Sequence, residues 1–279
     1  MSPSEQLETI RRVAAAAEAE DGAAPYDEAT WLGLKRADGS VQAWVEPEAF
    51  AVLDHGTLSV AVDPGSRGRG VATRLLDRVL ADAGDAVRAV WSHADHPAAA
   101  RLAARHGFTR ARELWVMRRP TSQPLPDLVL PPHVTIRSFR DDDLPALLRV
   151  NAASFAAHPE QGGMDEASFA ERIAEPWWDP AGLLVAVDDD GRLLGFHWTK
   201  QHDAEVGEVY VVGIDPDVQG IGLGRLVTLA GLHHLAGLGV SEVILYVESD
   251  NAPAIRVYRD KLGFTHAPED THVMYVRAG

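Results

Sequence analysis

The sequence predicts an α/β protein built from two tandem domains of one fold. Two passages, 58–74 and 209–225, each run from an apolar stretch through Asp-Pro into a glycine-rich loop. Apolar runs of strand length alternate with longer segments of helical character along the chain. A chain of 279 residues is also long enough to build two hydrophobic cores.

The first half reads as an alternation of helices and strands. It opens with a charged, alanine-rich segment that favours a helix, and apolar segments follow. The predicted helices cover 4–20, 26–35, 71–84 and 97–107, and the predicted strands include 87–93 and 111–119.

The second half repeats this alternation. Three aspartates at 141–143 suit the N-terminus of a helix, where side-chain oxygens and negative charge are both stabilising. The predicted helices cover 141–155, 166–175, 222–239 and 252–263. The predicted strands cover 134–139, 182–188, 192–200, 206–215, 240–249 and 272–277.

A proline-rich segment separates the halves. Residues 118–133 contain five prolines, which cannot donate a backbone hydrogen bond and break both helices and interior strands. We therefore expect an extended linker over 120–132, between a first domain over 1–119 and a second over 133–279.

The two halves match in three blocks that follow the same order. "VAVDP" at 60–64 aligns with "VGIDP" at 212–216, and "RGRGVA" at 67–72 aligns with "QGIGLG" at 219–224. Farther on, "DHPAAARLAARHGF" aligns with "NAPAIRVYRDKLGF". Matched blocks in constant order indicate an internal duplication.

Composition limits the possible functions. The formal charge of −15 argues against nucleic acid or an anionic membrane as partner, because both favour a basic surface. The absence of cysteine excludes disulfides and a cysteine nucleophile, and the twelve histidines lack metal-ligand spacing. With neither a run of about 18 apolar residues nor a signal peptide evident, we expect a cytoplasmic protein, and a monomer.

The glycine-rich loop has the composition of a phosphate-binding turn. Glycines let the backbone approach an anion closely, and the first N–H groups of the following helix have no intrahelical partner. The loop is neither a dinucleotide fingerprint nor a P-loop, because the acidic ribose-binding residue and the Gly-Lys-Ser/Thr sequence are missing. Taken alone, such a loop is more often a tight strand-to-helix turn than a binding site.

The strand ending in Asp-Pro, the loop and "NAPAIRVYRDKLGF" together resemble the acyl-CoA-binding core of the GCN5-related N-acetyltransferases. The resemblance implies a mixed, mostly antiparallel sheet with flanking helices in each domain. It also implies acetyl-CoA as cofactor and no metal. In this family the strand before the loop splays from its neighbour and pairs with pantetheine, while the loop holds the pyrophosphate.

Carried onto this sequence residue by residue, the resemblance gives a cofactor site in the second half and a reduced copy in the first. The residues of the second half are Val212, Gly213, Ile214, Gln219, Gly220, Ile221, Gly222, Leu223, Gly224, Arg225, Asn251, Ala252, Pro253, Ala254, Ile255 and Arg256. Those of the first half are Val60, Ala61, Val62, Gly68, Arg69, Gly70, Val71, Ala72 and Thr73.

The second half also carries the candidate catalytic residues. The family places a carboxylate base on the strand before the loop and a tyrosine acid near the CoA sulfur, which correspond to Glu208 and Tyr258. A period of two would put Glu208, Tyr210 and Val212 on one face of the strand. The aligned positions of the first half are Gly56 and Leu102, which cannot exchange a proton, so we expect that half to be non-catalytic.

Further segments resemble tandem members of the family that acetylate the cysteinyl amine of a cysteine–glucosamine–inositol compound. These segments are "DGAAPYDEA", "HPEQGG", "GFHWTK" and "LYVESDNAPAIRVY". The implied partner is a small amino-sugar thiol, and the implied substrate-binding residues are Glu28, Glu160, Lys200, Glu208 and Tyr246. Asp27 departs from the serine usual in that group.

Several alternatives stay open at this level. The acceptor could be another small amine, such as an aminoglycoside or a protein N-terminus, or the chain could be a non-catalytic acyl-CoA sensor. His158 and His197 could line the acceptor pocket. Trp177 and Trp178 are expected to fill the core, and the side chains of His233 and His234 to point apart.

Overall fold

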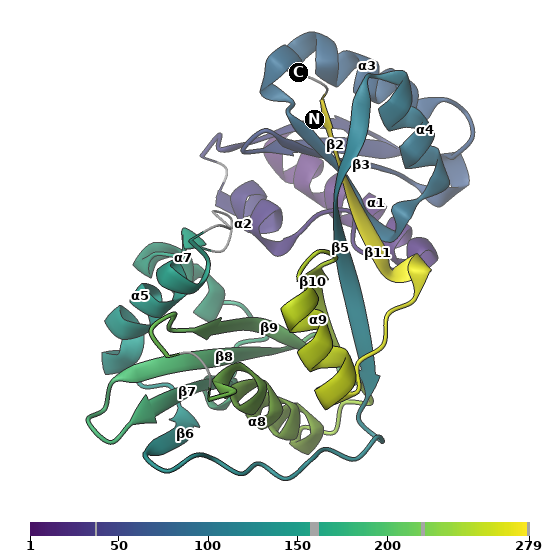
Figure 1. Ribbon diagram of the computed structural model, residues 1–279. Helices are drawn as coiled ribbons and strands as arrows, with labels where there is room; N and C mark the ends of the chain where they lie inside the picture. The colour runs from purple at the N-terminus through teal and green to yellow at the C-terminus, as the bar shows by residue number, and fades with distance from the viewer. Residues whose placement is uncertain (37, 157–161, 219–220, 278–279) are drawn as a thin grey trace. The chain divides into compact units, whose positions relative to one another are not determined.

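The computed structural model describes residues 1–36, 38–156, 162–218 and 221–277, which form two compact units (Figure 1). Unit 1 comprises Met1–Trp115, Glu248–Asp250 and Ala267–Gly279, and unit 2 comprises Val116–Val247 and Asn251–His266. Each unit has a sheet of mainly antiparallel strands with helices on both faces, which confirms the predicted fold class.

Unit 1 is built around strands in the order β1-β2-β3-β4-β11-β5. Its helices are α1 (Pro3–Asp21), α2 (Glu28–Arg36), α3 (Val71–Ala83) and α4 (Pro97–Arg105). Its strands are β1 (Val41–Glu46), β2 (Ala49–Asp54), β3 (Thr57–Val62), β4 (Ala89–Ser92), the first part of β5 (Phe108–Pro120) and β11 (Thr271–Arg277).

The alternation of side chains along β2 explains why both faces of this sheet are covered. Phe50 and Val52 pack with Ile10 and Val13 of α1, whereas the intervening residues pack in a cluster with residues of α3. A strand buried on both faces reads as a continuous apolar run, as "AFAVLD" does.

Unit 2 continues from the end of β5 with strands in the order β10-β9-β8-β7-β6. Its helices are α5 (Leu144–Ser154), α7 (Glu166–Ile173), α8 (Leu223–Gly237) and α9 (Ala252–Arg256). Its strands are β6 (Val134–Ser138), β7 (Leu183–Asp188), β8 (Leu193–Gln201), β9 (Val206–Ile214) and β10 (Glu242–Glu248).

The same alternation holds in unit 2. Val185 of β7 packs with Leu147 and Val150 of α5 in a hydrophobic cluster that we call the α5 cluster. Its neighbour Ala186 packs with Val227 of α8 in a second cluster, which we call the α8 cluster. Trp177 and Trp178 lie against the α5 cluster, as expected.

The units do not follow the expected boundaries of 1–119 and 133–279, because the chain crosses between them. Strand β5 begins in unit 1 and ends in unit 2. The final strand, β11, pairs antiparallel with both β4 and β5 in unit 1. The last strand of the sequence is therefore an interior strand of the N-terminal sheet.

The proline-rich segment has no helix or strand between Thr121 and His133, as its composition predicts. It is fixed by the buried guanidinium of Arg119, which is only 1% exposed. This group donates hydrogen bonds to the carbonyl oxygens of Leu262, Pro120, Gln123 and Pro124 at 2.6–3.1 Å. His233 adds a contact between its Nε2 and the carbonyl oxygen of Pro126 at 3.0 Å.

The described residues include neither a membrane-spanning helix nor a cluster of metal ligands. No helix among them combines the length and the apolar character needed to cross a bilayer. No group of three or more histidine, aspartate or glutamate side chains among them is arranged to hold a metal ion.

Candidate functional site

In unit 2 the two central parallel strands separate at the point where the candidate cofactor site begins. The register of β9 with β10 runs from Val206↔Glu242 to Val209↔Leu245 and ends there, although β9 continues to Ile214. On its other side β9 remains paired with β8 up to Ile214↔Gly195. The divergence leaves one edge of Tyr210–Ile214 available to a ligand.

The loop after β9 leads into the N-terminus of α8. Gly222 caps this helix with φ of 72°, a left-handed conformation that favours glycine. Among the residues that the structure describes, no side chain caps the helix, so its first N–H groups can bind an anion. Gln219 and Gly220, predicted to bind the same ligand, lie outside the described residues.

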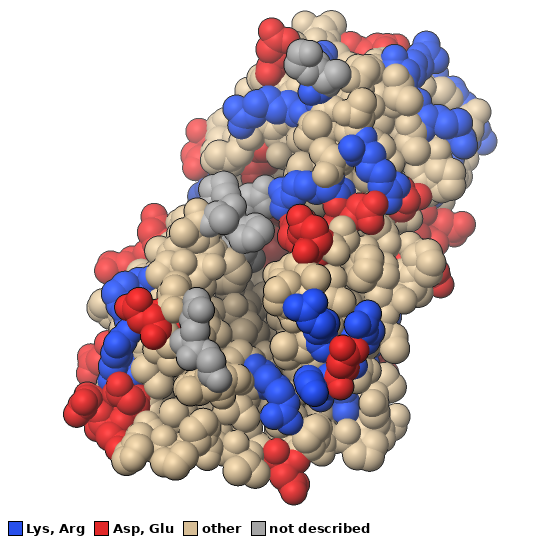
Figure 2. Space-filling model, viewed as in Figure 1, with Lys and Arg blue, Asp and Glu red and all other residues tan. Residues whose placement is uncertain are grey.

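Exposed basic side chains gather along α9 and the segment that follows it. Figure 2 shows them over α9 and the segment that follows, where Arg256, Arg259 and Lys261 are exposed. Asn251 caps α9 by accepting a hydrogen bond from the N–H of Ala254 at 3.2 Å. On a chain with a net charge of −15, a local basic cluster favours an anionic ligand at this place.

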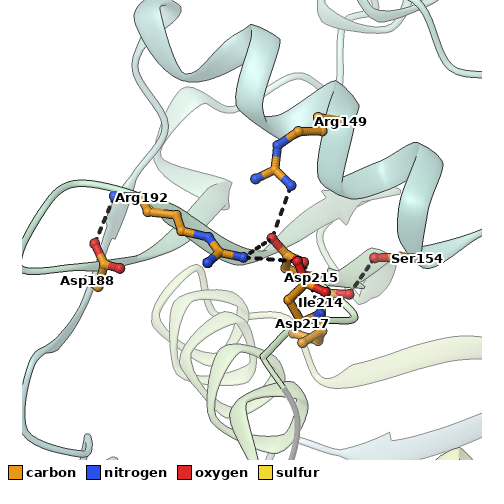
Figure 3. A network of polar contacts seen from close by, with 7 residues as sticks. All are labelled: Arg149, Ser154, Asp188, Arg192, Ile214, Asp215 and Asp217. Atoms are coloured by element: carbon orange, nitrogen blue, oxygen red, sulfur yellow. Dashed lines mark hydrogen bonds and ion pairs between the residues drawn. The ribbon is translucent and has the colours of Figure 1, made fainter.

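The start of the loop is anchored by Asp215, the aspartate of the Asp-Pro pair. This carboxylate is 2% exposed and accepts hydrogen bonds from Arg149 at 3.1 Å and Arg192 at 2.9 Å (Figure 3). The bond from Arg192 is the main cause that lowers the pKa of Asp215 to about 2. Ser154 also donates to the carbonyl oxygen of Ile214 at 2.7 Å. This network was not predicted from the sequence, because its members are far apart in the chain.

Three of the predicted substrate and catalytic residues share one face of the sheet. Lys200 is the cross-strand partner of Glu208, and Glu208 is the partner of Ile244, two residues before Tyr246. Directly paired residues, and residues two apart on a strand, point to the same face. The sheet therefore brings together Lys200, Glu208 and Tyr246 from three adjacent strands.

The expectation that Glu208, Tyr210 and Val212 share this face is wrong beyond Tyr210. The register of β8 with β9 shifts between Trp198 and Thr199, which is a β-bulge. As a result Tyr210 packs with the α5 cluster, whereas Val212 packs with the α8 cluster. The extra residue reverses the alternation at the point where the pairing of β9 with β10 ends.

Glu208 itself is 6% exposed and makes a hydrogen bond to His202, with 2.6 Å between Oε2 and Nε2. His202 was not among the site residues predicted from the sequence. The succession of strands 192–200 and 206–215 is consistent with a hairpin, but it does not indicate which residue between them faces Glu208.

Tyr258, the candidate acid, follows α9 in a π-helical turn over Val257–Lys261. Its ring lies 6.1 Å from that of Phe264, centroid to centroid. Burial raises the pKa of Tyr258 to about 12, so the hydroxyl stays protonated at neutral pH. In the part of the chain that the structure describes, this hydroxyl has no hydrogen-bond partner.

The other predicted substrate residues fall in different places. The ammonium of Lys200 lies 4.7 Å from the ring centroid of Trp177 and 5.3 Å from that of Tyr210, which are cation–π contacts. Glu28 begins α2 in unit 1, whereas the residues above belong to unit 2. Glu160 lies outside the described residues, as does His158 of the same segment.

His197 does not line a pocket. It is fully buried, and its Nδ1 donates to the carbonyl oxygen of Val227 at 2.9 Å. Burial lowers the pKa of His197 to about 4, so the ring is neutral. His233 and His234 contact Pro126 and Asp179 respectively, which confirms that their side chains diverge.

Unit 1 keeps the loop geometry without counterparts of the candidate catalytic residues. Gly68 and Gly70 have φ of 73° and 76°, and Gly70 caps α3 as Gly222 caps α8. The parallel register of β3 with β4 likewise covers only Thr57 and Leu58, four residues before β3 ends.

The two aligned positions in unit 1 have structural explanations. Gly56 lies in the turn before β3 with φ of 86°, whereas the aligned residue of unit 2, Glu208, lies within β9. Leu102 packs against the core cluster of unit 1.

Comparison with known proteins gives full-length matches. The model of the acetyltransferase (GNAT) family matches residues 13–108 and again 149–264. A protein of Nocardioides sp. named mycothiol acetyltransferase is 58% identical over 289 aligned residues and 97% of each chain. A protein of Actinosynnema mirum with the same name is 48% identical over 95% of this chain and 94% of its own.

Solved structures agree in fold. A tandem GNAT protein from the clavulanic acid biosynthesis pathway superimposes with a TM-score of 0.71 and 20% identity, over 98% of this chain and 94% of its own. A GCN5-related N-acetyltransferase from Sphaerobacter thermophilus gives 0.69 and 24% identity, over 100% and 95%.

Proposed function

The chain belongs to the acetyltransferase (GNAT) family and is an acetyl-CoA-dependent N-acetyltransferase, and we propose that its acceptor is the cysteinyl amine of the cysteine–glucosamine–inositol precursor of mycothiol. The observation that carries this proposal is the 58% identity, over nearly the whole of both chains, to a protein named mycothiol acetyltransferase. The reaction would take place in unit 2, where Glu208 and Tyr258 both lie.

In the proposed reaction the acetyl thioester lies along the free edge of β9. The residues that would hold it are Val212, Gly213 and Ile214 on the strand, the N-terminus of α8, and Asn251–Arg256. We propose that the corresponding residues of unit 1 bind cofactor or maintain the fold without catalysing transfer, because Gly56 and Leu102 replace the two proton-handling groups.

Glu208 is proposed as the general base, directly or through water. An α-amine has a pKa near 7.7–8.0, so roughly 10–20% of it is already neutral at pH 7. A weak base is therefore sufficient for this substrate. The amine nitrogen attacks the thioester carbonyl carbon, its proton passes to Glu208, and the carbon–sulfur bond breaks to release the thiolate of CoA.

Tyr258 is proposed as the acid that assists departure of the sulfur. A tyrosine with a pKa of about 12 is a poor donor to a thiolate whose conjugate thiol has a pKa of about 8.5. Its main contribution would then be a hydrogen bond to the departing sulfur, where negative charge develops.

Steady-state turnover tests the acceptor. Purified enzyme with acetyl-CoA is given cysteinyl-glucosaminyl-inositol, an aminoglycoside or a peptide with a free N-terminus, and CoA release is measured. A kcat/KM at least ~100-fold higher for the first acceptor supports the proposal, and the absence of such a preference contradicts it. Binding of acetyl-CoA with no release of CoA in the presence of any of these acceptors would instead favour an acyl-CoA sensor.

A further inference from the structure

The carboxylate of Glu208 is held from one side by an imidazole at the protein surface. His202 Nε2 and Glu208 Oε2 are 2.6 Å apart, and the two side chains are 36% and 8% exposed. Within the described residues no other group hydrogen-bonds this carboxylate, so its Oε1 remains free to accept a proton.

The turn that carries His202 is fixed by its own hydrogen bonds. The N–H of His202 donates to the carbonyl oxygen of Val206 at 2.9 Å, which closes the β8–β9 hairpin. Asp203 Oδ1 accepts from the N–H groups of Glu205 and Val206, both at 2.8 Å. These bonds lower the pKa of Asp203, so it stays ionised and keeps the turn closed at neutral pH.

The start of β10 holds the same turn from the other side. The carbonyl oxygen of Glu205 accepts from the N–H groups of Ser241 and Glu242 at 2.9 and 3.0 Å. Ser241 Oγ donates to Glu205 Oε2 at 2.7 Å. His202 is therefore presented by a hairpin bound to its neighbouring strand, and its ring is positioned over β9.

We propose that His202 is a positioning residue for acetyl transfer, acting through Glu208. By donating Nε2–H to Oε2 it holds the carboxylate in one rotamer, in which Oε1 accepts the proton of the attacking amine. Hydrogen bonds that involve an ionised group are roughly twice as strong as neutral ones, so one such bond can fix the rotamer. This inference rests on the proposed role of Glu208 as the base.

The test is a double-mutant cycle with a conservative rescue. His202→Leu removes the donor, His202→Gln keeps an amide N–H of similar reach, and each is also made in a Glu208→Gln background. His202→Ala is a second truncation in case leucine impairs folding. His233→Leu is the control, because this exposed histidine contacts only the carbonyl of Pro126 among the described residues. Turnover of cysteinyl-glucosaminyl-inositol, KM for acetyl-CoA and melting temperature are measured for each.

We expect His202→Leu to lower kcat by ~10-fold to ~100-fold, as small misplacements of a reacting group do, with KM for acetyl-CoA unchanged. His202→Gln should retain most of the wild-type kcat. In the Glu208→Gln background, His202→Leu should lower kcat by less than about twofold, because the effects of coupled residues are not additive. Equal losses in both backgrounds, or no loss in the wild type, overturn the role of His202. If Glu208→Gln itself leaves kcat unchanged, the assignment of the base is at fault instead.

Discussion

The imidazole of His197 occupies the space that a side chain at Gly231 would need. A Cβ atom built on Gly231 would lie 2.1 Å from two atoms of this ring, far inside van der Waals contact. The ring is fully buried between β8 and α8, and its Nδ1 is bonded to the helix at Val227. Helix α8 can pack this closely on the sheet only because residue 231 has no side chain.

Gly231→Ala is therefore expected to destabilise the protein even though alanine favours helices. Overpacking of a core costs about 1–3 kcal/mol of unfolding free energy, which outweighs the gain of up to ~1 kcal/mol in helix propensity. Urea denaturation followed by circular dichroism measures the change. Gly237→Ala is the matched control in the same helix, since a Cβ there has no atom within 4 Å. Equal stability of both variants would contradict the packing argument.

Asp215→Asn should destabilise the protein in a pH-dependent way. The folded-state pKa of about 2 lies below the ordinary value of ~3.9, so the carboxylate stabilises the fold above pH ~4 and loses this effect as the pH falls towards 2. We expect a loss of about 1–2 kcal/mol at pH 7, moderated because both arginines are about half exposed.

Urea midpoints measured from pH 7 to pH 3 check this expectation. The gap between wild type and Asp215→Asn should narrow below pH 4. Asp217→Asn serves as control, because the Asp217 side chain is 82% exposed and its ion pair with Arg192, at 3.5 Å, is a weak surface contact. A gap that stays constant with pH would show that the ionisation of Asp215 does not contribute.

Tyr258→Phe should lower kcat by roughly 10²-fold if its hydroxyl assists the departing sulfur. Because the pKa of Tyr258 is about 12, its ionisation should leave the wild-type profile of kcat flat up to pH ~10. Rates measured from pH 6 to 10 test both points. A basic limb in this range that disappears in Tyr258→Phe would contradict the high pKa. Tyr275→Phe in unit 1 is the control and should keep full activity.

In the Arg119→Met variant the start of the linker, residues 120–124, should unfold more readily than in the wild type. The substitution leaves four carbonyl oxygens without their shared donor, and we expect a loss of about 2–4 kcal/mol of stability. Arg118→Met is the neighbouring control, because Arg118 is about one-third exposed and pairs with Glu242 near the surface. Limited proteolysis between 121 and 133 and thermal melting measure the difference. Similar behaviour of the two variants would exclude Arg119 as the anchor.

Local patterns in the sequence were sufficient to predict most elements and the two glycine-capped loops. The Asp-Pro turn and the alternation along β2 depend on neighbours in the chain, and such features can be read directly. The bulge beside Tyr210, the pairing of His202 with Glu208 and the burial of His197 depend on contacts across strands and helices. No spacing encodes these, so a strict period of two placed Val212 on the wrong face.

The course of the last strand was also beyond local reasoning, because "HVMYVR" predicts extended structure without naming its neighbours. Its place between β4 and β5 has a consequence for synthesis on the ribosome. Unit 1 cannot complete its sheet until residues 271–277 have been translated, so β4 and β5 each keep one unpaired edge while residues 121–270 are being synthesised. Deletion of β11 would then disrupt the unit that was synthesised first rather than the unit that precedes the deletion in the sequence.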